Sequence, residues 1–348
     1  MRLAAALAVM LGHSYGIASI EYEPILAFTH RETFGSLAVY AFFLISGILV
    51  SASFAKQSSL LRFVGLRVLR IWPGAIVCAL FIALVIGPIF NSLSVAEYFS
   101  TSQVAHWLVR NASLIGEIGG PLPGVFPNNR FRFMVNPTVW TLPVELGCYL
   151  VVLVAGMLGA IRSKHGMMVF IVLAGIAFGY FAMHPPGHVM LKNFFTLVLM
   201  YSFYPVPFFL LGMVLYVFRE KIPLHWLPAV LLLVAYALFR YTPAGAILLY
   251  PVFAYGLLWI ASAQSLRRLQ PRHDYSYGIY LYGFMAQQVT AGMFPNLNNY
   301  VSLLVAMLIA VGLAALSWHF VERPCLFFLR RKASVPLAGV STPTSTSA

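Results

Sequence analysis

The sequence is poor in charged side chains and in cysteines, and both shortages narrow the class of protein. Only 9% of its 348 residues are charged, and Asp and Glu together number 9. Soluble domains carry roughly a quarter charged residues, so a soluble globular fold is excluded. The three cysteines, Cys78, Cys148 and Cys325, lack the paired spacing of a metal site or a disulfide framework. We therefore expect neither a metal centre nor a disulfide-built scaffold.

Long apolar runs dominate what remains. Hydrophobic residues make up 61% of the chain, and the mean hydropathy is +0.85. Runs of this length predict an all-α integral membrane protein with about ten transmembrane helices. The runs cover residues 3–20, 34–54, 71–90, 139–161, 167–183, 194–218, 224–239, 244–263, 275–294 and 300–320.

The positive charges support this topology. If both termini are cytoplasmic, 16 of the 22 lysines and arginines fall on the cytoplasmic side, as the positive-inside rule requires. Most of the net charge of +13 is then explained by the lysines and arginines that the topology places on the cytoplasmic side. No nucleic-acid partner is needed to explain it. The lipid bilayer is the expected partner. We expect one transmembrane domain at residues 1–332 and a disordered tail, rich in Ser, Thr and Pro, at 333–348.

The first apolar run carries two polar side chains on one helical face. Arg2 and His13 are eleven residues apart, close to three helical turns, and therefore stand roughly 16 Å apart along the axis. Arg2 is expected at one mouth of the membrane and His13 near mid-depth. An imidazole at that depth is either hydrogen-bonded to a neighbouring helix or a catalytic or proton-handling group. The sequence alone leaves both interpretations open.

Two later runs also hold polar candidates. Glu145 follows the start of the fourth run, about 9 Å inside its outer boundary, and is either functional or a paired structural charge. Ser46 and Gly47 lie within the second run, where small residues favour close helix approach.

Arg67 and Arg70 precede the third run, and their i, i+3 spacing places them on one helical face. Paired guanidinium groups bind phosphates through bidentate hydrogen bonds. Anchoring at the cytoplasmic membrane surface is the alternative. Pro73 is expected to start the third span.

The longest polar connection, residues 91–137, is expected on the outer face. Its first part, 95–115, suggests an interfacial helix, and its second part is rich in Gly, Pro and Asn, which favour turns. Arg130 and Arg132 in this second part contact either a sugar chain or lipid headgroups. At the end of the last run, Glu322 and Arg323 suggest a simple charge pair.

Taken together in order, six motifs resemble the acyltransferase-3 family, the multi-pass bacterial enzymes typified by O-antigen and exopolysaccharide O-acetylases. The similarity extends through nearly the whole chain. The motifs are the Arg2 and His13 pair, FFLISG at 42–47, RVLRIWP at 67–73, WTLPVE at 140–145, YSYGIYL at 275–281 and VERP at 321–324.

The resemblance implies an O-acetyltransferase of the bacterial inner membrane. It would move an acetyl or other short acyl group from cytoplasmic acetyl-CoA, used as a substrate rather than a bound cofactor, to a glycan hydroxyl. In our hypothesis Arg2, Arg67 and Arg70 hold the coenzyme's phosphates. His13 is then the general base or the transient acyl carrier, with Glu145 orienting it. The remaining candidates for substrate binding are Ser46, Trp140, Arg130 and Arg132.

Two other classes compete with this interpretation. In a proton-coupled transporter, His13 and Glu145 handle protons and the arginines recognise an anionic solute. A catalytically inactive relative that serves as a membrane interaction partner is the third possibility. Transport predicts uptake without an acyl donor, whereas the enzyme needs an acyl donor and a hydroxyl acceptor.

Overall fold

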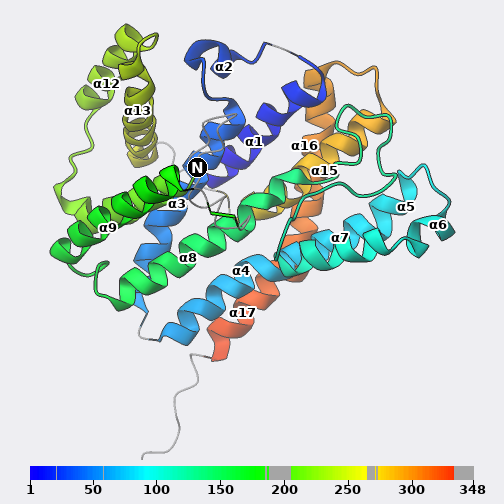
Figure 1. Cartoon of the computed structure of the whole chain (residues 1–348), viewed down its shortest axis with the longest axis horizontal. Coiled ribbons are helices and arrows are strands. Elements are labelled where there is room, and N and C mark those ends of the chain that lie inside the picture. Colours follow the sequence, from blue (N-terminus) through cyan, green and yellow to red (C-terminus); the bar gives the residue numbers. More distant parts are fainter. Residues whose placement is uncertain are drawn as a thin grey trace, which may run out of the picture.

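The computed structural model describes residues 1–20, 22–57, 59–184, 186–187, 205–264, 271 and 273–332. These residues form helices and connections, with one isolated β-bridge between Asn91 and Val125 (Figure 1). The tail predicted at 333–348 lies outside them. The helices are α1 (Arg2–Ile17), α2 (Pro24–Thr29), α3 (Phe34–Lys56), α4 (Leu60–Phe81), α5 (Gly87–Ile89), α6 (Val95–Ser100), α7 (Ser102–Ser113), α8 (Thr141–Met157), α9 (Lys164–Met183), α11 (Pro205–Phe218), α12 (Trp226–Phe239), α13 (Pro243–Ser262), α15 (Ser276–Met293), α16 (Asn299–Ser317) and α17 (Arg323–Lys332).

Six helical segments in the described part are long and apolar enough to cross a membrane, and their outward faces are rich in exposed Leu, Val, Ile and Phe. The all-α, multi-pass membrane class is therefore confirmed, while the count of about ten spans and the orientation of the termini stay predictions. The six segments are Phe34–Lys56, Leu60–Ile89, Pro137–Met157, Lys164–Phe181, Pro243–Ser262 and Asn299–Phe328.

Helix α3 forms the centre of the packing, against α11 on one side and α1 on another. Glycines permit the contact between α3 and α11. A Cβ on Gly47 would lie 2.1 Å from the Phe209 carbonyl oxygen, and a Cβ on Gly212 would lie 2.3 Å from the Leu44 carbonyl oxygen. The close helix approach expected at Ser46 and Gly47 is thus present, and it brings the α3 and α11 backbones together.

The start of α4 differs from the expectation. Pro73 does not begin this helix but lies inside it, and α4 begins at Leu60 after Ser59, whose side chain accepts a hydrogen bond from the Arg62 amide. A capping serine satisfies a free amide at the helix start, and this local signal outweighs the disruption by one internal proline. Arg67 and Arg70 therefore project from within a helix.

The long connection between α5 and α8 folds back into the protein. Its first part forms the two helices α6 and α7, and its second part forms turns, close to the expectation. At its end, the Asn136 amide nitrogen donates to the Leu281 carbonyl on α15 at 2.8 Å, and both residues are buried. The segment that leads into α8 is therefore held inside the molecule against α15.

Helices α1 and α15 both begin level with the middle of α4 rather than with its start. The Tyr277 hydroxyl donates to the Ile71 carbonyl at 2.6 Å, which aligns the start of α15 with the middle of α4. Because α4 starts at Leu60, it extends about 15 Å beyond this level, and α17 packs beside the extension (Figure 1). The polar groups described below lie at the level where α1 and α15 begin beside the middle of α4.

We expect Gly47→Ala to destabilise the folded protein by about 1–3 kcal/mol, because the new methyl group must displace the α11 backbone. Thermal unfolding of the purified protein in detergent measures the change. Gly175→Ala on α9 is the matched control, since nothing lies within 4 Å of its Cβ position. Equal melting temperatures for the two variants would show that the α3 and α11 contact is not tight.

Candidate active site

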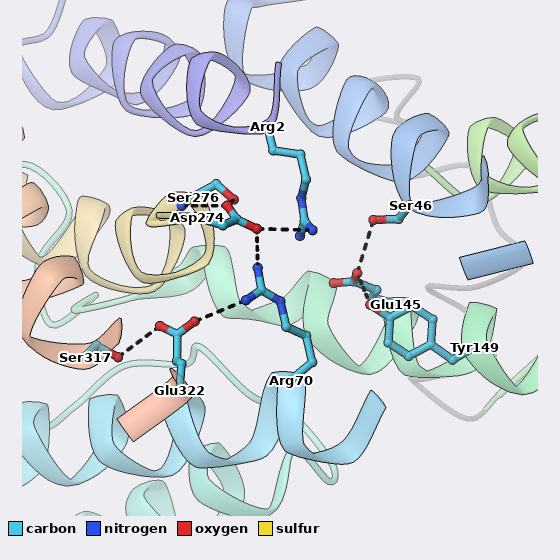
Figure 2. A network of polar contacts seen from close by, with 9 residues as sticks. All are labelled: Arg2, Ser46, Arg70, Glu145, Tyr149, Asp274, Ser276, Ser317 and Glu322. Atoms are coloured by element: carbon cyan, nitrogen blue, oxygen red, sulfur yellow. Dashed lines mark hydrogen bonds and ion pairs between the residues drawn. The ribbon is translucent and has the colours of Figure 1, made fainter. Parts of the chain in front are cut away.

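A buried arginine on α4 connects segments that are far apart in the sequence. The Arg70 guanidinium donates to Asp274, with 2.8 Å between nitrogen and oxygen, and to Glu322 at 3.4 Å (Figure 2). Arg2, at the first residue of α1, lies 3.6 Å from the same Asp274 oxygen. These four charged groups tie together α1, α4, the start of α15 and the end of α16.

Each carboxylate has a serine that fixes its free oxygen. The Ser276 hydroxyl donates to Asp274 at 2.5 Å, and the Ser317 hydroxyl donates to Glu322 at 3.1 Å. Glu322 ends a π-helical turn, Trp318–Glu322, between α16 and α17. A π-turn adds a residue to the helix and redirects side chains, often at functional sites. The expectation that Glu322 pairs with Arg323 was wrong, because this turn directs Glu322 to Arg70.

Asp274 lies just before α15, outside the membrane-spanning helices. Burial by itself raises the pKa of this carboxyl. Arg70, Arg2 and the hydrogen bonds from Ser276 outweigh burial and hold the pKa below the ordinary 3.8. Asp274 is therefore ionised at neutral pH, where it neutralises part of the charge of the two arginines.

Glu145 lies beside this network in a pocket of its own. Its carboxylate accepts hydrogen bonds from the Tyr149 hydroxyl and from the Ser46 hydroxyl, the latter at 3.4 Å (Figure 2). The pocket is partly open and spans about 400 Å³, and its polar lining includes Arg2, Ser46, Glu145 and Tyr280. The structure thus brings together three of the predicted site residues, Arg2, Ser46 and Glu145.

Arg67 approaches the same region from α4. Its guanidinium lies 5.6 Å from the centre of the Tyr149 ring and 5.9 Å from that of Phe63. The Nε atoms of Arg2, Arg62 and Arg67 are buried, and none of them has a hydrogen-bond partner within the described part of the chain. Free guanidinium donors therefore gather where α1 begins and along α4.

His13 lies further along α1, away from Glu145. Its ring meets the Phe284 ring of α15 edge to face, with 5.3 Å between the centres. In the described residues its imidazole makes no hydrogen bond to protein, and no contact joins it to Glu145. Neither a structural hydrogen bond for His13 nor an orienting role for Glu145 is supported by this arrangement.

The connection between α5 and α8 approaches His13 through Phe131, whose ring centre lies 5.9 Å from that of Phe284. Gln288 anchors this segment, because its amide nitrogen donates to the Phe131 carbonyl at 2.8 Å and to the Met134 carbonyl at 2.6 Å. Arg130 and Arg132, on either side of Phe131, are exposed. They are therefore accessible to a ligand on that face.

Trp140 lies apart from these arginines. It ends the short 3-10 turn Pro137–Trp140 directly before α8 and is half-buried. It borders the start of the helix that carries Glu145.

Sequence reasoning missed Asp274 and Tyr149. Asp274 directly precedes the YSYGIYL motif and is one of only 9 acidic residues, which was the available signal. Tyr149 stands four residues after Glu145, on the same helical face, so its hydrogen bond followed from helix periodicity. Among the described residues, no group of His, Cys, Asp and Glu is arranged to hold a metal ion.

Comparison with known proteins identifies the class. Residues 1–319 match the family described as an acyltransferase domain, acyltransferase 3, and the chain belongs to this family. An O-acetyl transferase of Shigella phage Sf6 is 27% identical over 328 residues, covering 92% of this chain and 93% of the relative. Nodulation protein 10 of Rhizobium leguminosarum bv. viciae is 26% identical over 345 residues, covering 94% and 92%. No solved structure matches the chain significantly.

The family resemblance predicted from the six motifs is thus confirmed, and so is an enzyme of the O-acetyltransferase kind. The transporter interpretation has no comparable support. The roles of the individual site residues stay predictions.

We expect Asp274→Asn to lower the melting temperature at neutral pH, because Arg70 and Arg2 lose a shared carboxylate. The pKa of Asp274 is lower in the folded than in the unfolded protein, so its stabilisation is present above the unfolded pKa and is lost as the pH falls through the folded pKa. The difference from wild type should therefore shrink as the pH falls below about 4. Melting curves in detergent at pH 7 and pH 3 measure it, and a constant difference would contradict the ion pairing.

Proposed function

We propose that this enzyme transfers an acetyl or other short acyl group from cytoplasmic acyl-CoA to a hydroxyl of a cell-surface or exported glycan, in the bacterial inner membrane. The arrangement of residues along α1 supports this proposal. Arg2, beside the free guanidinium donors, begins this helix, and His13 lies three turns further on, next to the outer connection. One helix therefore links a region suited to an anionic donor with a region open to a glycan.

The donor's phosphates are expected to bind where α1 begins. Arg67 and Arg2 each carry a buried, unpartnered Nε–H group, and phosphate oxygens accept hydrogen bonds from such donors. Arg70 differs, because two carboxylates already engage its guanidinium. We therefore assign Arg70 to holding the site together and Arg67 and Arg2 to direct phosphate contact.

Glu145 is expected to shape the adjacent pocket rather than to act on His13. Its carboxylate accepts hydrogen bonds from the hydroxyl groups of Tyr149 and Ser46 in the pocket that Glu145 and Arg2 both line. A flexible acyl-pantetheine arm that enters here is directed along α1 toward His13, whose position in the helix is roughly 16 Å further on.

At His13, the neutral imidazole accepts the proton of the glycan hydroxyl while the hydroxyl oxygen attacks the thioester carbonyl. The C–S bond breaks, the ester forms, and the coenzyme leaves as its thiol after taking up a proton. In a two-step variant the ring nitrogen carries the acyl group first. The two routes differ in whether labelled acyl group stays on the protein when the acceptor is absent.

The glycan acceptor is supported by the phage relative, which is named an O-acetyl transferase, and by the exposed pair Arg130 and Arg132 near Phe131. Exposed guanidinium groups suit an acidic or phosphate-bearing glycan. Trp140 and Ser46 lie on the side of Glu145 and are closer to the proposed path of the donor.

We expect His13→Gln to reduce acyl transfer by about 10²- to 10⁴-fold, because the base is lost while the helix remains intact. The assay measures radiolabel transferred from acetyl-labelled acetyl-CoA into the host's glycan fraction by membranes that contain equal amounts of protein. His106→Gln is the matched control, since His106 is exposed on α7. Equal transfer by both variants would remove His13 from the mechanism.

We expect Arg67→Gln to raise the KM for acetyl-CoA about 10- to 100-fold and to change kcat little, because it removes uniform binding of the donor. Initial rates at varied acetyl-CoA and saturating glycan measure this split. Arg110→Gln, an exposed arginine on α7, serves as the control. A fall in kcat at unchanged KM would place Arg67 at the reacting centre instead.

A further inference from the structure

A second pocket lies at the end of α1 opposite Arg2. It lies between the ends of α1, α15 and α16 and the turn that joins the last two, and its space of about 410 Å³ is partly open to the outside. Every side chain that lines it is uncharged. The polar ones are Ser14, Gln287, Asn299 and Ser302, and Phe294 adds an aromatic face.

Gln287, which lines this pocket, carries an unsatisfied hydrogen-bond acceptor. Its side chain is only 3% exposed, and its amide nitrogen donates to the Met10 carbonyl at 2.8 Å. That bond fixes the amide, and its Oε1 atom is buried with no hydrogen-bond partner within the described part of the chain. Leaving a buried carbonyl oxygen unpaired is unfavourable, so a ligand that donates a hydrogen bond to it gains affinity.

Further polar groups stand beside Gln287. The Asn299 amide nitrogen donates to the Ser14 hydroxyl at 3.3 Å, which leaves the Asn299 carbonyl oxygen and the Ser302 hydroxyl for a ligand. Amides and hydroxyls that surround an aromatic ring match a molecule with several hydroxyl groups and an apolar face. An anionic headgroup is disfavoured because no cation lines the pocket.

We infer that this pocket binds a neutral sugar ring of the acceptor glycan, with a sugar hydroxyl donating to Gln287 Oε1. This inference rests on the proposed function and names the site that holds the acceptor. Ser14 directly follows His13 in α1, and Phe284, which contacts the His13 ring, lies one turn before Gln287 in α15. A sugar bound here therefore lies next to the helical turn that carries His13.

The test is a binding measurement without any acyl donor. Calorimetric titration compares the binding of the host's surface polysaccharide, freed of its acetyl esters by mild alkali, to full-length wild type, Gln287→Met and Ser302→Ala in detergent. We expect binding about five- to tenfold weaker for Gln287→Met and about threefold weaker for Ser302→Ala. Ser302→Ala changes the same pocket but keeps the hydrogen bond between Gln287 and Met10, so weaker binding by this variant does not result from the loss of that bond. Ser102→Ala, an exposed serine on α7, should bind as wild type does.

Permethylated polysaccharide provides the chemical control, because it keeps its glycosidic backbone but has no hydroxyl donors, and we expect it not to bind. Equal affinity of wild type and Gln287→Met for the native glycan would overturn the inference, as would binding of the permethylated form. So would the absence of any glycan binding by wild type. Since no donor is present, failure of the transfer assay with acetyl-CoA contradicts the proposed reaction and leaves this result intact.

Discussion

The arrangement of this protein depends on the burial of one guanidinium group. A cation inside a membrane protein is costly unless its charge and its N–H groups are matched. Arg70 is matched by Asp274 and Glu322, which lie 204 and 252 residues further along the chain. The requirement to satisfy this one group therefore fixes the start of α15 and the end of α16 against the middle of α4, and Arg2 brings α1 to the same place.

Because α1 is anchored at Arg2, its length determines where everything else on it lies. The pocket with Glu145 is at its first residue, His13 follows after three turns, and the neutral pocket with Gln287 is at its far end. The connection between α5 and α8 approaches His13 through Phe131, which packs near Phe284 and is held by Gln288. One helix thus sets the spacing between Arg2, His13 and the pocket with Gln287, and so between the donor region, the base and the acceptor pocket that we propose.

Hydropathy predicted the helical membrane class, and the ordered set of motifs predicted the family. Arg2, Ser46 and Glu145 were each singled out as site candidates, and the structure shows that they line one pocket. The sequence did not predict the start of α4, since a capping serine and a proline gave opposite local signals. Nor did it predict that Glu322 pairs with Arg70, or that Glu145 is apart from His13. Those contacts depend on how distant helices are aligned, and the contact of Asn136 with Leu281 on α15 has no local signature.

The π-turn before Arg323 makes part of this site depend on residue count rather than residue type. Glu322 faces Arg70 because the helix contains this wider turn at Trp318–Glu322. Deleting one residue there would restore regular α-helical winding and remove the wider turn that directs Glu322 to Arg70. Over evolutionary time, substitutions along this helix are therefore easier to accept than single-residue insertions or deletions, and related chains should preserve its length more strictly than its composition.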